Sequence, residues 1–238
     1  MEMFDSIAQE LFKRQIKFKN GRYYIEVPNE ESERMNWFSS YYWALIQNKM
    51  FKKLGGDYFV DEYYTSKLTG HVFGSKISKM VKTKHLVAPI ISLIVKQFGY
   101  GKITPKKTNY KDDWLTFEFY DPPVGREVSK FFGFQKLPVD YSICGLVAGS
   151  AEQLIERKFI TMETSCVGCG DEKCTIETLS PTHFREKLEG IKNKEQKEIL
   201  SKIYALEEKT DFGKEVKILM KNRNKLAIIN EQKYLSEK

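Results

Sequence analysis

Cysteine placement constrains this sequence more than any other single feature. None of the four cysteines precedes Cys144, and Cys166, Cys169 and Cys174 fall within nine residues. Four cysteines in 238 residues are too few for a small fold held together by disulfides. Clustering of this kind, in a chain expected to be cytoplasmic, indicates metal or redox chemistry.

The sequence around the cysteines predicts one helix followed by a hairpin. Residues 138–156 have helical spacing, with a face of small side chains that contains Cys144. Two strands, over 158–163 and 175–179, flank a loop over 164–174 that contains two glycines. Because its small-residue face allows close approach, the helix can lie against the sheet that this hairpin joins.

A hairpin brings the side chains at its two ends together. Glu163 ends the first strand, Cys166 opens the loop and Cys174 begins the returning strand, so these residues converge without any long-range contact. With Cys144 from the helix they form a tetrahedral ligand set, which a structural zinc ion prefers. Cys169 could replace Glu163 and give an all-thiolate set. Since the protein would fill all four positions, we expect a structural rather than a catalytic metal.

Other interpretations of the cysteines stay open. Four thiolates could hold an iron–sulfur cluster instead of zinc. Cys166 and Cys169 could form a redox pair, although the pattern predicts no helix N-terminus there to lower a thiol pKa. The cysteines could also be ordinary buried core residues.

Three segments around the cysteines resemble the 4-vinyl-reductase domain family. They are residues 145–155, 159–166 and 170–174. That family has a helix, then a strand with a Glu shortly before a Cys, then a loop with Gly-Asp that another Cys closes. The match is specific over 138–179, looser over 36–137 and absent over 182–238.

The resemblance implies an α+β fold, with an antiparallel sheet packed by helices, related to TRAPP vesicle-tethering subunits and to haem-nitric-oxide sensor domains. Members of the family are mostly sensory or bind small hydrophobic molecules. In its aromatic-responsive transcription activators, a zinc ion held by three Cys and one Glu braces the ligand pocket. Cys144, Glu163, Cys166 and Cys174 match those ligands by position, whereas Cys169 departs from most members.

Apolar periodicity predicts the elements outside this region. They are helices at 3–12, 33–54, 63–81 and 86–98, a hairpin at 16–27, strands at 102–108 and 114–120, and two charged helices at 182–209 and 212–235. We expect one domain over 1–181 and a helical extension over 182–238. The apolar stripes of the extension must be buried against the domain, a second copy or a partner.

The predicted helices before the cluster are candidates for the walls of a ligand pocket. Gly70 and Gly74 stand one turn apart, and glycine is unfavourable inside helices, so this face predicts close approach by another backbone or by a ligand. The candidate pocket residues are Trp37, Tyr41, His71, Phe73 and Trp114. Each has core packing as its alternative, because aromatic residues at helical spacing are usually core residues.

The charge pattern does not favour nucleic-acid binding. A net charge of +7 arises from 39 basic and 32 acidic residues, so both signs are abundant and mixed. No stretch approaches the roughly 20 apolar residues of a membrane span. Residues 1–13 carry three acids instead of the basic and apolar regions of a secretory signal. We therefore expect a cytoplasmic protein without a membrane span.

No sequence motif points to an enzyme. The chain contains no Walker loop, dinucleotide fingerprint, HExxH motif or nucleophile elbow. We expect a zinc-braced homodimeric sensor that binds a small hydrophobic or aromatic molecule and signals through 182–238, the segment that could also dock a protein partner. A non-catalytic assembly subunit of the TRAPP kind is the alternative. An enzyme of tetrapyrrole vinyl reduction, suggested by the family's name, is the third class.

Overall fold

The computed structural model describes most of the chain. The described residues are 16–19, 22–25, 33–35, 40–78, 83–97, 100–120, 122–219 and 221. The predicted helix at 3–12, the turn residues of the predicted N-terminal hairpin, Trp37 and the predicted helix beyond residue 221 lie outside the described residues.

The hairpin predicted near the N-terminus is present. Strands β1 (Ile16–Lys19) and β2 (Arg22–Ile25) pair antiparallel, and β3 (Glu33–Met35) extends this small sheet by pairing with β2. The prediction of a helix beginning at residue 33 was therefore wrong. Backbone pairing with β2 outweighs the local helical spacing, and helix α2 (Ser40–Leu54) begins later.

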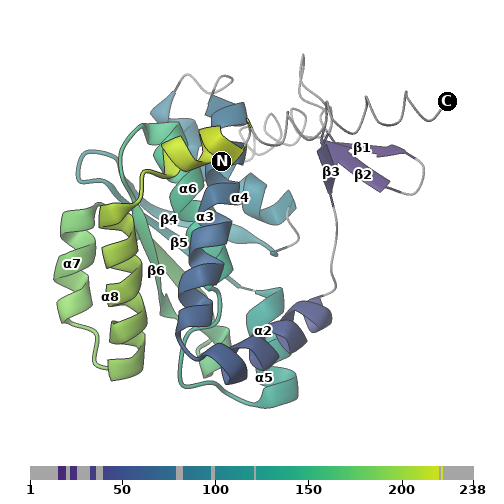
Figure 1. Ribbon diagram of the computed structural model, residues 1–238, viewed down its shortest axis with the longest axis vertical. Coiled ribbons are helices and arrows are strands. Elements are labelled where there is room, and N and C mark those ends of the chain that lie inside the picture. The colour runs from purple at the N-terminus through teal and green to yellow at the C-terminus, as the bar shows by residue number, and fades with distance from the viewer. Residues whose placement is uncertain are drawn as a thin grey trace.

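The centre of the fold is a four-stranded antiparallel sheet in the order β4-β5-β7-β6. Its strands are β4 (Ile103–Asn109), β5 (Trp114–Phe119), β6 (Ile160–Ser165) and β7 (Cys174–Leu179). All four were predicted from the sequence. With helices packed on the sheet, this architecture confirms the predicted α+β fold class (Figure 1).

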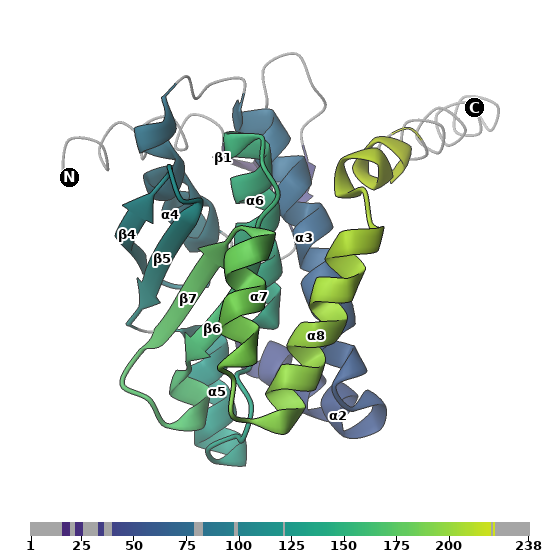
Figure 2. The same ribbon diagram turned by 90° about the vertical axis from the view of Figure 1, so that its left-hand side faces the viewer.

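Helices cover both faces of the central sheet. The helices that follow α2 include α3 (Asp57–Ser78), α4 (Val87–Gln97), α5 (Pro123–Phe132), α6 (Tyr141–Ile155), α7 (Pro181–Glu189) and α8 (Lys194–Lys209). Helix α6 packs on β6 and β7 from one face, and α7 packs on the same strands from the other (Figure 2). Helix α3 lies against α6 as a second helical layer (Figure 1). No helix within the described part of the chain has the length and apolar character needed to cross a membrane.

Two helix predictions need correction. No helix was predicted between residues 120 and 138, yet α5 forms there, with Pro122 as its N-cap and Pro123 as its first helical residue. Proline is tolerated in the first turn because its missing N–H would have no helical partner there. The single helix predicted at 182–209 is divided into α7 and α8, since α7 ends at Gly190 and the Asn193 side chain caps α8.

The predicted close approach at the glycine-bearing helix is confirmed, and the partner is another backbone. A Cβ built on Gly145 of α6 would overlap the carbonyl oxygen of Tyr63 in α3, and one on Gly149 would overlap that of Lys67. A Cβ on Gly70 would in turn overlap the carbonyl oxygen of Leu146. Glycines on both helices therefore allow α3 and α6 to cross in direct backbone contact.

The described part of the C-terminal extension folds back on the domain. Phe184 of α7 and Ile199, Leu200 and Ile203 of α8 belong to the same buried cluster as the core of the sheet. Helix α8 lies beside α3 and strand β6 (Figure 2). The Gln196 side chain donates a hydrogen bond to the carbonyl oxygen of Glu163 at 3.2 Å, so α8 also covers the free edge of β6.

Candidate metal centre

The β6–β7 hairpin places three of the predicted ligands at one end of the sheet. Glu163 pairs with Ile176 across the hairpin. Strand side chains alternate between the two faces, so Glu163 and Ile176 share the face of Cys174. Cys166 follows directly after β6 and begins the 3₁₀ turn η2 (Val167–Cys169).

Backbone hydrogen bonds and a glycine hold this turn in shape. The Cys166 N–H donates to Asp171 Oδ2 at 2.7 Å, and the Cys169 N–H donates to the Cys166 carbonyl oxygen at 2.9 Å. A Cβ built on Gly168 would lie 2.9 Å from Val139 Cγ2. A larger residue at position 168 would therefore push the turn away from the segment that leads into α6.

Asp140, the N-cap residue of α6, reaches the same place from the helical layer. An Asp at an N-cap usually accepts a hydrogen bond from the first turn of its helix, but the Asp140 side chain makes no such bond. Instead Asp140 Oδ2 accepts from Cys174 Sγ at 3.4 Å, and the Asp140 N–H donates to Glu163 Oε2 at 3.1 Å. The start of α6 is thereby tied to both strands of the hairpin.

Asp140, Glu163, Cys166 and Cys174 form a buried group that we call the four-residue group. One ligand atom of each lies within 4.8 Å of all the others, and all four side chains are buried. Asp140 Oδ1 and Glu163 Oε1 have no hydrogen-bond partner among the described residues. A buried polar atom without a partner is costly. These two unpaired oxygens therefore indicate that the group needs a cation or a hydrogen-bond donor, which the described side chains do not supply.

The ionisation of these residues reflects their burial and their closeness. Burial raises the pKa of Asp140 to about 8 and that of Glu163 well above its usual range. Hydrogen bonds from the thiols of Cys169 and Cys174 lower the pKa of Cys166 to about 3. The negatively charged forms of two carboxyl groups and two sulfurs would therefore lie close together in a buried place, with little positive charge to stabilise them. A divalent cation would supply that charge.

The donor set fits zinc better than a harder cation. Zinc binds cysteine sulfur together with carboxylate oxygen in four-coordinate sites. Magnesium and calcium prefer sites made of oxygen alone. The four-residue group provides two sulfur and two carboxylate donors, the number of ligands that a four-coordinate zinc site needs.

Of the five predicted ligands, three lie in the four-residue group and two lie outside it. Cys144 is buried one helical turn beyond Asp140, whose carbonyl oxygen accepts from the Cys144 N–H at 3.1 Å. Cys169 is partly exposed and stands beside Cys166, with their side chains in hydrogen-bond contact. Asp140 was missed by the sequence analysis. Its signal was an acid between Val139 and Tyr141, near the start of the helix predicted over 138–156.

A second buried polar cluster lies between α3, α6 and α8. The Nζ atom of Lys67 is 2.8 Å from Glu152 Oε1 and 2.6 Å from both carboxylate oxygens of Glu207. Tyr63 donates to Glu207 Oε1 at 3.0 Å, and His71 Nε2 lies 2.6 Å from Glu152 Oε2. Since Lys67 is fully buried, this cluster is a structural link between the two helical layers and α8.

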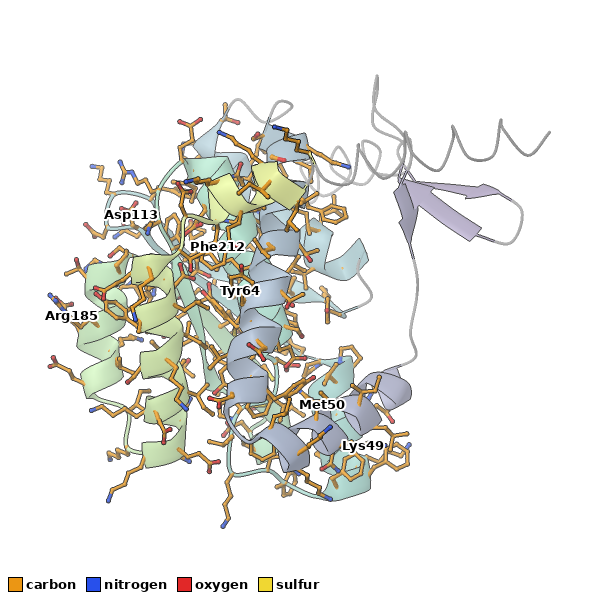
Figure 3. The ribbon with its side chains drawn as sticks, viewed as in Figure 1. Lys49, Met50, Tyr64, Asp113, Arg185 and Phe212 are labelled. Carbon is orange, nitrogen blue, oxygen red and sulfur yellow. The ribbon has the colours of Figure 1, made fainter. Side chains whose placement is uncertain are left out.

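An open cleft borders this cluster where the chain leaves α8. Its volume is about 610 Å³. The lining residues are His71, Ser78, Glu152, Gln153, Glu156, Arg157, Lys158, Thr210, Asp211, Phe212 and Gly213. The Phe212 ring stacks on His71 with centroids 5.7 Å apart and lies next to Tyr64 of α3 (Figure 3). One wall of the cleft is therefore the segment that leads into the helix over 212–219.

The predicted pocket residues do not gather in this cleft. His71 lines it, whereas Phe73 and Trp114 are not among its lining residues. Trp114 is half-buried at the start of β5, between Lys107 and Lys187, whose Nζ atoms lie 4.5 and 4.8 Å from its ring centroid. Tyr41 lies in α2, in the part of that helix of which only the backbone is described.

The chain is thus an α+β domain in which the start of α6 and the β6–β7 hairpin enclose a buried group of two cysteines and two acids. No family model matches the sequence, and no curated protein is significantly similar to it. Among solved structures, the chain is similar to the phenol-responsive sensory domain of the transcription activator PoxR, crystallised with phenol. The two share 17% identity over 74% of this chain and 90% of that chain, with a TM-score of 0.60. At this identity the comparison shows a shared fold.

Two further solved structures match at lower TM-scores. A vinyl-4-reductase family protein from Methanocaldococcus jannaschii shares 21% identity over 60% of this chain and 82% of that chain, with a TM-score of 0.40. A trafficking protein particle complex subunit 3 from Naegleria fowleri, covalently bound to palmitic acid, shares 16% identity over 59% of this chain and 93% of that chain, with a TM-score of 0.41. The neighbours therefore include a protein of the family that the sequence resembles, a sensory domain of a transcription activator and a subunit of a trafficking protein particle complex.

Proposed function

We propose that the chain is a metal-braced sensory domain that binds a small apolar or aromatic molecule. Zinc is the proposed metal, and Asp140, Glu163, Cys166 and Cys174 are its proposed ligands. The observation that carries the metal is the pair of orphaned carboxylate oxygens, Asp140 Oδ1 and Glu163 Oε1, inside a buried group that already contains two sulfurs. When bound, the ion supplies positive charge that joins the start of α6 to the hairpin.

Such a brace would matter to the whole domain. Zinc binding in small structural sites is worth about 10–16 kcal/mol, which is comparable to the free energy of unfolding of a typical protein, about 5–15 kcal/mol. With every donor supplied by the protein, the proposed role is structural, because a catalytic zinc keeps one position open for water or substrate.

The metal is tested by comparing two substitutions in neighbouring turns of the same segment. Asp140→Asn should lower the zinc content of the purified protein and its melting temperature, because Asn is a weaker ligand without charge. Cys144→Ser, one turn away, should keep the zinc. Equal zinc content in wild-type and Asp140→Asn proteins, measured by native mass spectrometry, would remove Asp140 from the site. The same spectra report whether the chain forms the homodimer that we expected from its sequence.

The sensory role is supported by the fold shared with the phenol-responsive domain and by the cleft beside His71. A cleft of about 610 Å³ has the size of an ordinary small-molecule site. Its lining includes the Phe212 ring and the His71 imidazole, which stack on each other and expose 3% and 4% of their surface, and the Gln153 amide as a polar group. A molecule bound there would touch both α3 and the segment 210–213, and so would affect how the C-terminal helices sit on the domain.

Ligand binding is tested by thermal shift with phenol and with a fatty acid as probes. A ligand at 100 times its Kd stabilises the folded state by about 2.7 kcal/mol, which is readily visible as a rise in melting temperature. Phe212→Ala should abolish the rise. Phe134→Ala removes an aromatic ring that is 74% exposed and does not line the cleft, and this variant should keep the rise. A rise that persists in Phe212→Ala would place the ligand elsewhere. If neither probe binds, the proposed ligand class is wrong, and the metal is tested independently.

A further inference from the structure

The four cysteines differ sharply in their access to solvent. Cys144, Cys166 and Cys174 expose 1%, 1% and 0% of their surface. Cys169 is the partly exposed one, and it is also the hairpin cysteine that the four-residue group does not include. A small oxidant arriving from solvent therefore meets the sulfur of Cys169 before it meets any of the others.

The η2 turn brings this exposed sulfur against a buried one. Cys166 and Cys169 stand at the two ends of a single 3₁₀ turn that is closed by the hydrogen bond from the Cys169 N–H to the Cys166 carbonyl oxygen. Their side chains are in hydrogen-bond contact. Gly170 follows with φ +101°, a left-handed conformation that favours glycine, and it ends the turn. Two cysteines at the ends of one closed turn, with two residues between them, are placed to form a disulfide.

We propose that Cys166 and Cys169 are a peroxide-sensitive thiol pair whose oxidation takes Cys166 out of the four-residue group. In the first step, the Cys169 sulfur attacks a hydroperoxide. A sulfur–oxygen bond forms, the oxygen–oxygen bond breaks, and the peroxide leaves as an alcohol or as water after taking up the thiol proton. The sulfur of Cys169 is oxidised by two electrons, and the peroxide is reduced by the same two.

In the second step, the Cys166 sulfur attacks the sulfenic sulfur of Cys169. The disulfide bond forms, the sulfur–oxygen bond breaks, and hydroxide leaves and takes up a proton to become water. Cys174 also contacts Cys166, but Cys174 is fully buried and its Sγ donates to Asp140 Oδ2. Cys174 is therefore not the sulfur that the oxidant reaches first.

The consequence for the metal rests on the proposed function. A sulfur in a disulfide is no longer a thiolate ligand, so Asp140, Glu163 and Cys174 would remain as three donors. Oxidation should then release the ion and loosen the connection between α6 and the hairpin. Cys169 would act as the sensing residue while leaving the reduced metal centre complete.

The positions of Lys158, Lys173 and Arg185 allow a decisive test. Trypsin separates the hairpin cysteines into peptide 159–173, which contains Cys166 and Cys169, and peptide 174–185, which contains Cys174. Treating the zinc-loaded protein with hydrogen peroxide should lower the mass of peptide 159–173 by two hydrogen atoms. A disulfide that joins 159–173 to 174–185 would overturn the assignment of the pair. So would oxidation that stops at a sulfinic acid on Cys169.

Two variants test the proposed thiol pair separately from the proposed metal centre. Cys169→Ser should bind zinc as the wild type does, and peroxide should neither form the disulfide nor release the ion. Cys144→Ser keeps the pair and should respond like the wild type. Peroxide-driven zinc release at the wild-type rate from Cys169→Ser would overturn the proposal. A protein that purifies without metal, yet forms the same disulfide, supports the thiol pair and contradicts the metal centre.

Discussion

The Nζ atom of Lys67 lies 2.6 Å from both carboxylate oxygens of Glu207, and these side chains expose 0% and 3% of their surface. Lys67 belongs to α3 and Glu207 to α8. The same nitrogen contacts Glu152 of α6 and the carbonyl oxygen of Phe159 at 2.8 Å each. A single buried ammonium group therefore connects both helical layers, the start of β6 and the C-terminal segment.

Removing this ammonium group should be strongly destabilising. In Lys67→Met, Glu207 and Glu152 would be left buried without their cation, and breaking a buried ion pair in this way costs about 3–5 kcal/mol. Lys202→Met is the matched control, because Lys202 pairs with Asp57 and Glu198 at an exposed position, where such pairs contribute about 0–1 kcal/mol. Urea unfolding of the two variants measures the difference. Similar losses in both would show that Lys67 does not stabilise the fold through its charge.

The glycine crossing of α3 and α6 should not tolerate a methyl group. Gly145→Ala would place a Cβ on the carbonyl oxygen of Tyr63, and overpacking of this kind costs about 1–3 kcal/mol. Gly190→Ala is the control, because a Cβ there would lie 3.4 Å from the Lys187 carbonyl oxygen, close to an ordinary contact. We expect a clear fall in melting temperature for Gly145→Ala and little change for Gly190→Ala. An unchanged melting temperature for Gly145→Ala would mean that the helices can separate freely.

The carboxyl group of Glu118 should titrate far below its ordinary pKa of 4.5. Hydrogen bonds from Lys173 and Tyr120, with the nearby Lys106, lower its pKa to about 2. A lowered folded-state pKa contributes stability above the unfolded pKa, and this contribution is lost as pH falls from about 4.5 towards 2. The lysines are well exposed, so the effect on stability should be small. NMR titration of the Glu118 carboxyl carbon gives the pKa directly, and a midpoint near 4.5 would contradict the prediction.

Chelation should loosen one particular region of the zinc-loaded protein. Because Cys166 and Cys174 lie at the two sides of the hairpin loop and Asp140 lies at the start of α6, removal of the ion should speed amide hydrogen exchange there first. The hairpin β1–β2 serves as the internal reference. Equal acceleration over the whole chain would indicate general unfolding and not the loss of a local brace.

Local patterns in the sequence predicted a large part of this fold. Strand-like segments predicted β4, β5, β6 and β7 close to their observed bounds. Burial alternates from one residue to the next in β5 and over most of β7, as expected for strands with one face on the core. The pattern failed at Glu33–Met35, where pairing with β2 replaces a predicted helix. It also missed α5, which begins at Pro122 and Pro123, because proline is tolerated in the first turn of a helix.

Sequence alone determined the hairpin half of the candidate site. Glu163, Cys166 and Cys174 meet because eleven residues of chain must turn back on themselves, and a hairpin brings its own ends together. Tertiary structure decided the helical half. Which turn of α6 reaches the hairpin depends on where the helix begins and on its glycine contacts with α3, so Asp140 stands in the four-residue group and Cys144 one turn away. The contact of Lys67 with Glu207 is of the same kind, because residues so distant in sequence meet only after the sheet and both helical layers have packed.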